Sequence, residues 1–468
     1  MAAGLLVPAL AVAGGAGVAI GGHRGEALIF VAAAPLLVLA IQALGYRSIL
    51  VWLALEGIAT PFLRWPSHHA LVSFDRVWIP LMALAAARST PGRRAPTRWM
   101  SGSVAVIVVW IGIRAALTSS SQTYAVGVWV DAFALPAMLV YTVRRFAQDA
   151  LRTDRIAGWF GVAGAVLGLI AVLERIVGFQ LATRSGGAVF IDPSVGVRYS
   201  GPYGQPDMLA VALLICLAMT FMWLQGDLRR RAVLGALVIS LELTGIWLTY
   251  FRGAWIAALV VVVLSVGLRP GRYARLFGFA ALVGAIAAVA FVQIGDSQSA
   301  LSARLGQTQN LTGRLATYRD GISLAAKHPL LGVGVAQYSA VASQQANTVV
   351  VAGTAAAIYP HNMYLDVLVE DGVFGFIALV AVSGGIWQLA RRLRRAAVTR
   401  QDVLLVAAFT AAALSYLILG MEETVILQAP PNLLLAVVVG LGAARLDAKA
   451  RARAGLTASQ SDDTFDLS

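Results

Sequence analysis

Long apolar runs alternate with short, polar, arginine-rich segments along almost the whole chain. Most runs hold about 17 to 22 residues, enough for a helix to cross a hydrocarbon core of about 30 Å. Backbone polar groups in lipid must be satisfied within the segment, so these runs favour helices. The pattern therefore predicts an all-α polytopic membrane protein with about 12 to 14 transmembrane helices. The predicted spans are residues 4–22, 26–45, 48–63, 70–87, 99–118, 124–143, 156–178, 207–225, 232–250, 254–268, 275–294, 372–390, 403–420 and 427–444.

Composition supports the membrane assignment. Apolar residues make up 59% of the chain and charged residues only 13%, and the mean hydropathy is +0.77. Soluble domains carry about 25% charged residues. The small-residue stretch at the start has no basic segment before it, so we expect an uncleaved first span rather than a signal peptide. Cys216 is the single cysteine, which excludes an intramolecular disulfide and a cysteine-rich metal site.

The net charge of +13 comes mainly from arginines grouped in alternate loops. Basic loops of membrane proteins face the cytoplasm, so both termini are expected there. The outer face then holds the loop 179–206, the turn at Arg252, a segment from about 295 to 371 and the short loop at Glu422. A nucleic-acid site would need one contiguous basic face, and scattered loops argue against such a partner. The basic groups lie within residues 88–98, 144–155, 229–231, 269–275, 391–400 and 445–453.

The outer segment divides the chain into five predicted regions. Its length of about 75 residues far exceeds that of the other connections, and long loops are uncommon unless they are functional. Leu315, Tyr318, Ile322 and Ala325 recur at helical spacing and predict an amphipathic helix that ends near Pro329. A second short helix is predicted in "PHNMYLDVLVEDG". The regions are N-terminal transmembrane helices (1–190), central transmembrane helices with an Arg-Gly turn (191–294), an extracytoplasmic catalytic loop (295–371), C-terminal transmembrane helices (372–446) and a disordered cytoplasmic tail (447–468).

Two arginines are candidates for an anion site. Arg252 stands in "LTYFRGAWIAAL", between two spans with almost no loop, where a charge is costly unless it is paired. Guanidinium presents a planar fork that matches phosphate oxygens, and Gly253 lets a ligand approach the backbone. Arg314, at the head of the amphipathic helix, is a candidate of the same kind. The alternatives are that Arg252 snorkels to lipid headgroups and that Arg314 is an ordinary solvated charge.

His361, one of five histidines, is the candidate base. Pro360 suits the first turn of a helix, which would place the imidazole at the positive end of the helix dipole and keep it neutral. A neutral imidazole can take a proton from a hydroxyl group. Asp366, Glu370 and Asp371 follow within reach and could raise its basicity or contact a sugar. The alternative is a histidine that caps a helix at the membrane surface.

Other catalytic patterns are weak or missing from the sequence. His68 and His69 are adjacent and would point about 100° apart on a helix, which makes a poor chelate. No His-Glu-x-x-His or Walker motif is present, so we expect neither a metal nor another cofactor. Further candidate substrate contacts are polar or aromatic residues of the outer segments, namely Arg198, Tyr199, Gln205, Asp207, Tyr318, Arg319, Tyr359, Asn362, Asp366 and Glu370.

Three stretches in order resemble the O-antigen ligase and polymerase superfamily with its Wzy-type C-terminal domain: "LTYFRGAWIAAL", "GRLATYRDGISLAAKHPLLGVGVAQY" and "PHNMYLDVLVEDGVFGF". "VRYSGPYGQPDMLA" is similar to an upstream segment of that family, so the resemblance covers about residues 195–440. It implies a GT-C-like membrane fold. It also implies transfer of a glycan from a polyprenyl (undecaprenyl) diphosphate donor to an acceptor hydroxyl, without metal or nucleotide sugar. By motif, Arg252 and Arg314 would bind the diphosphate and His361 would be the general base.

The family includes ligases to lipid cores of lipopolysaccharide, polymerases of surface polysaccharides and protein-glycan transferases, so the acceptor is a glycan, a lipid core or a protein. The implied location is a bacterial inner membrane, with membrane lipids around the spans and the active site outside. Gln205, Asp207, Phe251 and Tyr318 depart from the family pattern, which bears on sugar specificity. The competing reading is a transporter of a small anion or lipid-linked sugar. A transporter would hold its charges near the bilayer midplane, whereas these candidates cluster at the outer surface.

Overall fold

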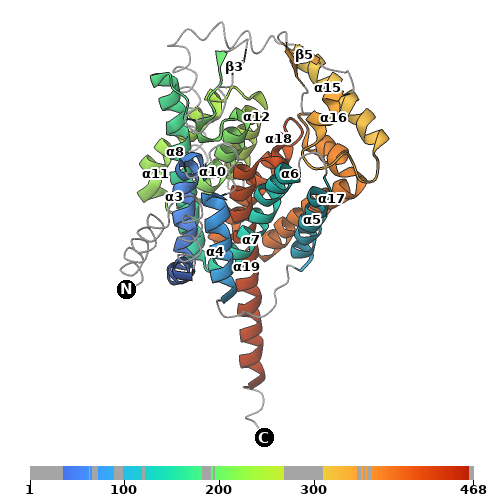
Figure 1. The fold of residues 1–468 in the computed structure, drawn as a ribbon. Helices are drawn as coiled ribbons and strands as arrows, with labels where there is room; N and C mark the ends of the chain where they lie inside the picture. The colour runs from blue at the N-terminus through green and yellow to red at the C-terminus, as the bar shows by residue number, and fades with distance from the viewer. Residues whose placement is uncertain are drawn as a thin grey trace, which may run out of the picture.

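The computed structural model describes residues 35–62, 64–65, 72–88, 98–118, 122–181, 191–192, 196–267, 309–344, 349–351, 354–356 and 360–462. Helices dominate this part of the chain (Figure 1). The main helices are α3 (Arg47–Phe62), α4 (Phe74–Arg88), α5 (Arg98–Leu117), α6 (Gln122–Trp129), α7 (Leu135–Phe146), α8 (Ala150–Val177), α10 (Pro206–Gly226), α11 (Leu228–Leu248), α12 (Arg252–Gly267), α15 (Gln309–Lys327), α16 (Tyr338–Gln344), α17 (Met363–Ala396), α18 (Arg400–Leu419) and α19 (Ala429–Asp462).

Short elements join these helices. A π-helical turn, η1 (Val130–Ala134), links α6 to α7, and 3-10 turns precede α10 and α19 at η2 (Gly201–Tyr203) and η3 (Val425–Leu427). Three two-stranded antiparallel hairpins lie outside the helices. They pair β1 (Arg64–Trp65) with β2 (Val72–Ser73), β3 (Ile191–Asp192) with β4 (Gly196–Val197), and β5 (Val349–Val351) with β6 (Thr354–Ala356).

The apolar runs of the described segments are helices, as the all-α membrane fold requires. Five helical stretches of the described residues are long and apolar enough to cross a membrane, or up to six if a bent pair near the start is one span. The predicted spans from 48 to 268 and from 372 to 444 coincide with α3 to α12 and α17 to α19. The predicted spans 4–22 and 275–294 lie outside the described residues, as do residues 26–34 of the span 26–45, so the total of 12 to 14 stays a prediction.

Helix α10 is the centre of the bundle. Of its most apolar window, 83% is buried, against 44% for α8 and 39% for α11. A helix that is apolar all round is expected to be enclosed by others, and α10 packs on α8, α11 and α18. Glycines let α8 and α11 approach closely: a Cβ added to Gly168 would lie 2.3 Å from the carbonyl oxygen of Leu241.

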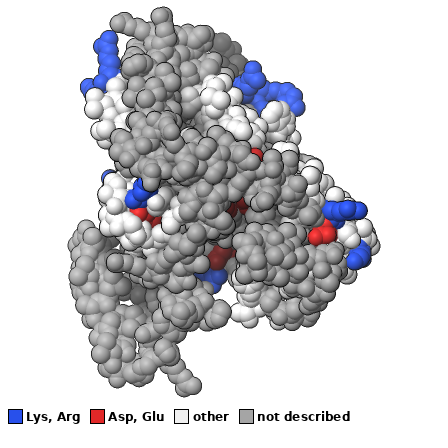
Figure 2. Space-filling model, turned by 90° about the horizontal axis from the view of Figure 1, so that it is seen from above, with Lys and Arg blue, Asp and Glu red and all other residues white. Residues whose placement is uncertain are grey.

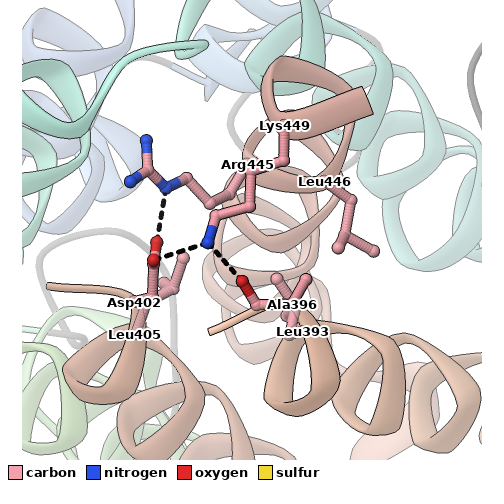
Figure 3. Close-up of a pocket in the computed structure, with 7 residues that line it drawn as sticks. All are labelled: Leu393, Ala396, Asp402, Leu405, Arg445, Leu446 and Lys449. Atoms are coloured by element: carbon pink, nitrogen blue, oxygen red, sulfur yellow. Dashed lines mark hydrogen bonds and ion pairs between the residues drawn. The ribbon is translucent and has the colours of Figure 1, made fainter. Parts of the chain in front are cut away.

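The end of the bundle nearest the C-terminus is fixed by an ion cluster (Figure 3). Asp402, only 3% exposed, accepts from Arg445 at 2.7 Å and from Lys449 at 2.5 Å, and Lys449 also donates to the carbonyl of Ala396. Asp447 pairs with Arg144 of α7 at 2.6 Å. The prediction of disorder from residue 447 therefore needs correction: α19 continues to Asp462, and its ion pairs hold the first turns of the presumed tail.

Helices α15 and α16 cover the opposite end of the bundle, above α17 (Figure 1). The predicted amphipathic helix is present as α15, and it ends at Lys327, two residues before Pro329. Of the predicted apolar face, Leu315 and Ile322 are 58% and 61% exposed, whereas Ala325 is buried. Ala325 and its neighbour Leu324 join a buried cluster with Val369 of α17, and Leu365 packs against that cluster.

Candidate active site

Helix α17 has a kink at Gly372, and the loop that follows α15 forms hydrogen bonds with the backbone there. Gly372 has φ 66°, a left-handed conformation that favours glycine, and a Cβ there would lie 2.2 Å from the carbonyl oxygen of Leu330. The loop residues take over the hydrogen bonding: the amide of Val373 donates to Pro329 at 2.9 Å, and the amide of Gly334 donates to Glu370 at 2.8 Å. The loop is thus strapped to the first, short part of α17.

The carboxylate of Glu370 also holds this loop against α17. It accepts the backbone N–H groups of Ala336 at 2.7 Å and Tyr338 at 3.0 Å, and the Glu370 residue is only 1% exposed. Asp366 is fully buried on the same stretch of helix. Both carboxylates are enclosed, so neither lies at the surface, where the sequence suggested a sugar contact.

His361 lies just before α17 rather than in its first turn. Asn362 is the N-cap, and its side-chain oxygen accepts the amides of Tyr364 and Leu365 at 3.0 Å each, so the helix begins at Met363. His361 has φ 47°, a backbone conformation that residues other than glycine rarely adopt. Such strain costs of order 1–3 kcal/mol and persists where surrounding contacts enforce it, often at functional sites.

Those contacts come from the turn between α18 and η3, at residues 420–423. The amide of Met363 donates to the carbonyl of Gly420 at 2.7 Å. The side chains of Asn362 and Tyr318 both donate to the carbonyl of Met421, at 3.4 and 3.3 Å. The turn is therefore held by the middle of α15 and the start of α17, and it presents Glu422 and Glu423 to the same region.

Glu423 joins the predicted base to a predicted arginine. The Nδ1 of His361 lies 3.0 Å from the Glu423 carboxylate, and Arg314 lies 3.9 Å from Glu423 and 3.9 Å from Glu422. Burial lowers the pKa of His361, but the hydrogen bond and charge of Glu423 outweigh it, so the pKa ends above its usual value. Arg314 opposes that rise and Asp207 adds to it. We expected the helix dipole to keep His361 neutral, whereas the nearby Glu423 carboxylate raises the pKa of this histidine.

Gly253, the glycine of the Arg-Gly motif, lies close to Glu422. Arg252 begins α12, and a Cβ added to the next residue, Gly253, would lie 2.3 Å from the Glu422 carboxylate oxygen. The turn before α12 is constrained as well: Tyr250 has φ 51°, and the guanidinium of Arg198 donates to the carbonyl of Thr249 at 2.9 Å. Arg198 therefore braces this turn, where the sequence suggested a sugar contact.

The remaining predicted contacts fall in different surroundings. Asp207 accepts from the side-chain amide of Gln428, and its charge acts on His361. Tyr199 is buried, with its amide donating to the carbonyl of Leu248 at 3.3 Å. Gln205 and Arg319 are exposed, and Tyr359 lies outside the described residues.

The two glutamates are the residues that sequence reasoning did not assign. Glu422 and Glu423 are consecutive acids in a very short loop, which equally fits hydrated loop residues. Only the fold brings that loop beside residues 60 and more positions away. Among the described residues, no group of three or more His, Cys, Asp and Glu side chains is placed to hold a metal ion.

The surface seen from above shows how charge is distributed. The described Lys and Arg side chains form separate groups on this face, and acidic side chains lie between and beside them (Figure 2). Charges of both signs also meet in the site, where Arg314 lies 3.9 Å from Glu422 and from Glu423.

Fold and site together define a multi-pass helical membrane protein with a histidine–carboxylate pair and arginine at one end of its bundle. Residues 235–380 match the family described as O-Antigen ligase. Arg252, Arg314 and His361 all lie within this segment.

A curated relative matches part of the chain. The "Exopolysaccharide production protein ExoQ" of Rhizobium meliloti (strain 1021) is 34% identical over 131 residues. The match covers 27% of this chain and 30% of that protein, so the chain spans less than a third of the relative's length in this comparison.

Proposed function

We propose that the protein is a glycosyltransferase that moves a glycan from a polyprenyl (undecaprenyl) diphosphate donor to an acceptor hydroxyl during polysaccharide synthesis. The observation that carries the proposal is the meeting of His361, Glu423 and Arg314 at the end of the bundle, from segments far apart in sequence. The family description and the name of the relative, which concern O-antigen ligation and exopolysaccharide production, support the same class of substrate.

His361 is suited to act as general base. When Nδ1–H donates to Glu423, the other ring nitrogen, Nε2, is left as the acceptor of a proton. The acceptor hydroxyl loses its proton to Nε2 as its oxygen attacks the anomeric carbon of the donor sugar. The bond from that carbon to the diphosphate oxygen breaks, and the diphosphate leaves with the electron pair. General-base help of this kind contributes about 10²- to 10⁴-fold in rate.

Arg314 and Arg252 supply the positive charge that a leaving diphosphate requires. Guanidinium groups remain protonated and bind phosphate oxygens through paired hydrogen bonds. Fixed positive charge aimed at the site where negative charge develops is commonly the largest contribution to catalysis. The starts of α12 and α15 would thus hold the two phosphates, while the polyprenyl chain lies among the apolar helices.

The location belongs to the same proposal. Lys and Arg cluster in residues 391–400, at the end of α17 and the start of α18, and in residues 445–453, in the second half of α19, whereas His361 precedes the start of α17. By the positive-inside rule these basic segments are cytoplasmic, which puts both termini inside and the active site on the outer face of a bacterial inner membrane. The acceptor is then a glycan, a lipid core or a protein on that face.

Two variants with matched controls test the proposal. Purified protein in lipid nanodiscs would be given a synthetic polyprenyl-diphosphate glycan and an acceptor glycan. His361→Ala should lower kcat by about 10²- to 10⁴-fold, and His328→Ala, which alters an exposed histidine, should not. Arg314→Ala should raise KM for the donor, whereas Arg230→Ala, at an exposed position in the first turn of α11, should not. Transfer at the wild-type rate by His361→Ala would exclude the proposed base.

A further inference from the structure

The arginine of the proposed diphosphate site already has anionic partners. Glu422 Oε2 and Glu423 Oε1 each lie 3.9 Å from the Arg314 guanidinium. A diphosphate placed beside Arg314 would meet two carboxylates, and like charges at this distance repel each other. At least one carboxylate must therefore move when an anion binds at this arginine.

The two glutamates differ in how firmly they are held. Glu423 also bonds to His361 at 3.0 Å, and its side chain is 17% exposed. Glu422 is 35% exposed, and its carboxylate lies 3.9 Å from the guanidinium of Arg314. Release of Glu422 would break one long, partly solvated ion pair, whereas release of Glu423 would also break the contact with the base.

The position of Glu422 is that expected for a phosphate group. Its carboxylate lies between Arg314 and the first turn of α12, so close to Gly253 that a Cβ there would be 2.3 Å from Oε2. Gly253 follows Arg252 directly, so this carboxylate lies between the two arginine motifs. A carboxylate and a phosphate present similar oxygens to guanidinium and backbone donors.

We propose that Glu422 occupies the place of the donor diphosphate in the free protein and withdraws when the diphosphate binds. This inference rests on the proposed function, because it concerns the anion site of the same reaction. Glu422 keeps the starts of α12 and α15 at the spacing of a bound diphosphate before the donor arrives. On transfer, the diphosphate gains negative charge, and the return of Glu422 to Arg314 promotes release of the polyprenyl diphosphate product.

If Glu422 occupies the place of the diphosphate, removal of this acid should tighten the binding of anions. Binding of inorganic pyrophosphate and of farnesyl diphosphate to the full-length protein in nanodiscs would be measured by calorimetry. Glu422→Gln and Glu422→Ala should each bind both ligands about two- to fivefold more tightly, the effect of one exposed ion pair. Product release should slow in the same variants. Asp320→Asn, which removes an acid elsewhere on α15, controls for net charge and should leave affinity unchanged.

The outcomes separate this inference from the proposed function. Unchanged or weaker pyrophosphate binding in both Glu422 variants, with the thermal unfolding temperature intact, overturns the role of Glu422. Equal tightening by Asp320→Asn overturns it also, since the effect would then be one of net charge. If Arg314→Ala and Arg252→Ala bind pyrophosphate as the wild type does, the diphosphate site itself is wrong.

Discussion

The pair of His361 and Glu423 gives the most detailed prediction. Glu423→Gln keeps the size of the side chain but removes its charge and can reverse the polarity of the hydrogen bond to Nδ1. A hydrogen bond to a charged group contributes about 1.5–3 kcal/mol. The side chains are 35% and 17% exposed, so solvent screening favours the lower end of that range. A loss of about 1.5 kcal/mol corresponds to a fall in kcat of roughly tenfold.

The pH profile distinguishes a positioning role from a merely structural one. The base works when deprotonated, so activity rises with pH through the pKa of His361. Glu423 holds that pKa above its usual value, and without its charge, burial and Arg314 lower it. The acid limb of kcat/KM should therefore shift to lower pH in Glu423→Gln. An unshifted acid limb, or an unchanged kcat in single-turnover transfer, would refute the assignment.

Three further substitutions test the surrounding framework. Gly253→Ala should raise KM for the donor about tenfold, because its Cβ would fill space that Glu422 occupies in the structure and that the diphosphate would occupy in the proposal; an unchanged KM for the donor would contradict this. Gly372→Ala should destabilise the protein by about 1–3 kcal/mol in thermal unfolding, since alanine is strained at φ 66°. Glu370→Ala should cost about 2 kcal/mol or more by stranding two amides, and Glu370→Gln should cost less.

The helices could be predicted from the sequence because each run is long enough and apolar enough to be buried in lipid or protein. The kink of α17 at Gly372 was harder to predict from the sequence. The stretch "VEDGVFG" contains the glycine, but its conformation depends on the carbonyl groups of residues 329 and 330, which are distant in the sequence. The same dependence explains Glu370. A carboxylate on an outer segment suits a sugar contact, yet here it accepts two amides of a loop about 34 residues upstream.

The candidate site was predictable in its residue types rather than its electrostatics. Motif order singled out Arg252, Arg314 and His361, and the structure connects Arg314 and His361 through one turn. We expected a helix dipole to keep His361 neutral, but Asn362 takes the cap position, so His361 precedes the helix, and Glu423 raises its pKa. Glu423 lies 62 residues away, and no local pattern reveals such a contact.

The central claim is that this protein makes a glycosidic bond at the expense of a polyprenyl-diphosphate glycan. The most direct measurement is the stoichiometry of that exchange by purified protein in nanodiscs, without nucleotide sugar. One polyprenyl diphosphate should be released for each new glycosidic bond, and both products should be lost together in His361→Ala. Movement of intact donor across a sealed vesicle membrane without bond formation would contradict it and identify a transporter.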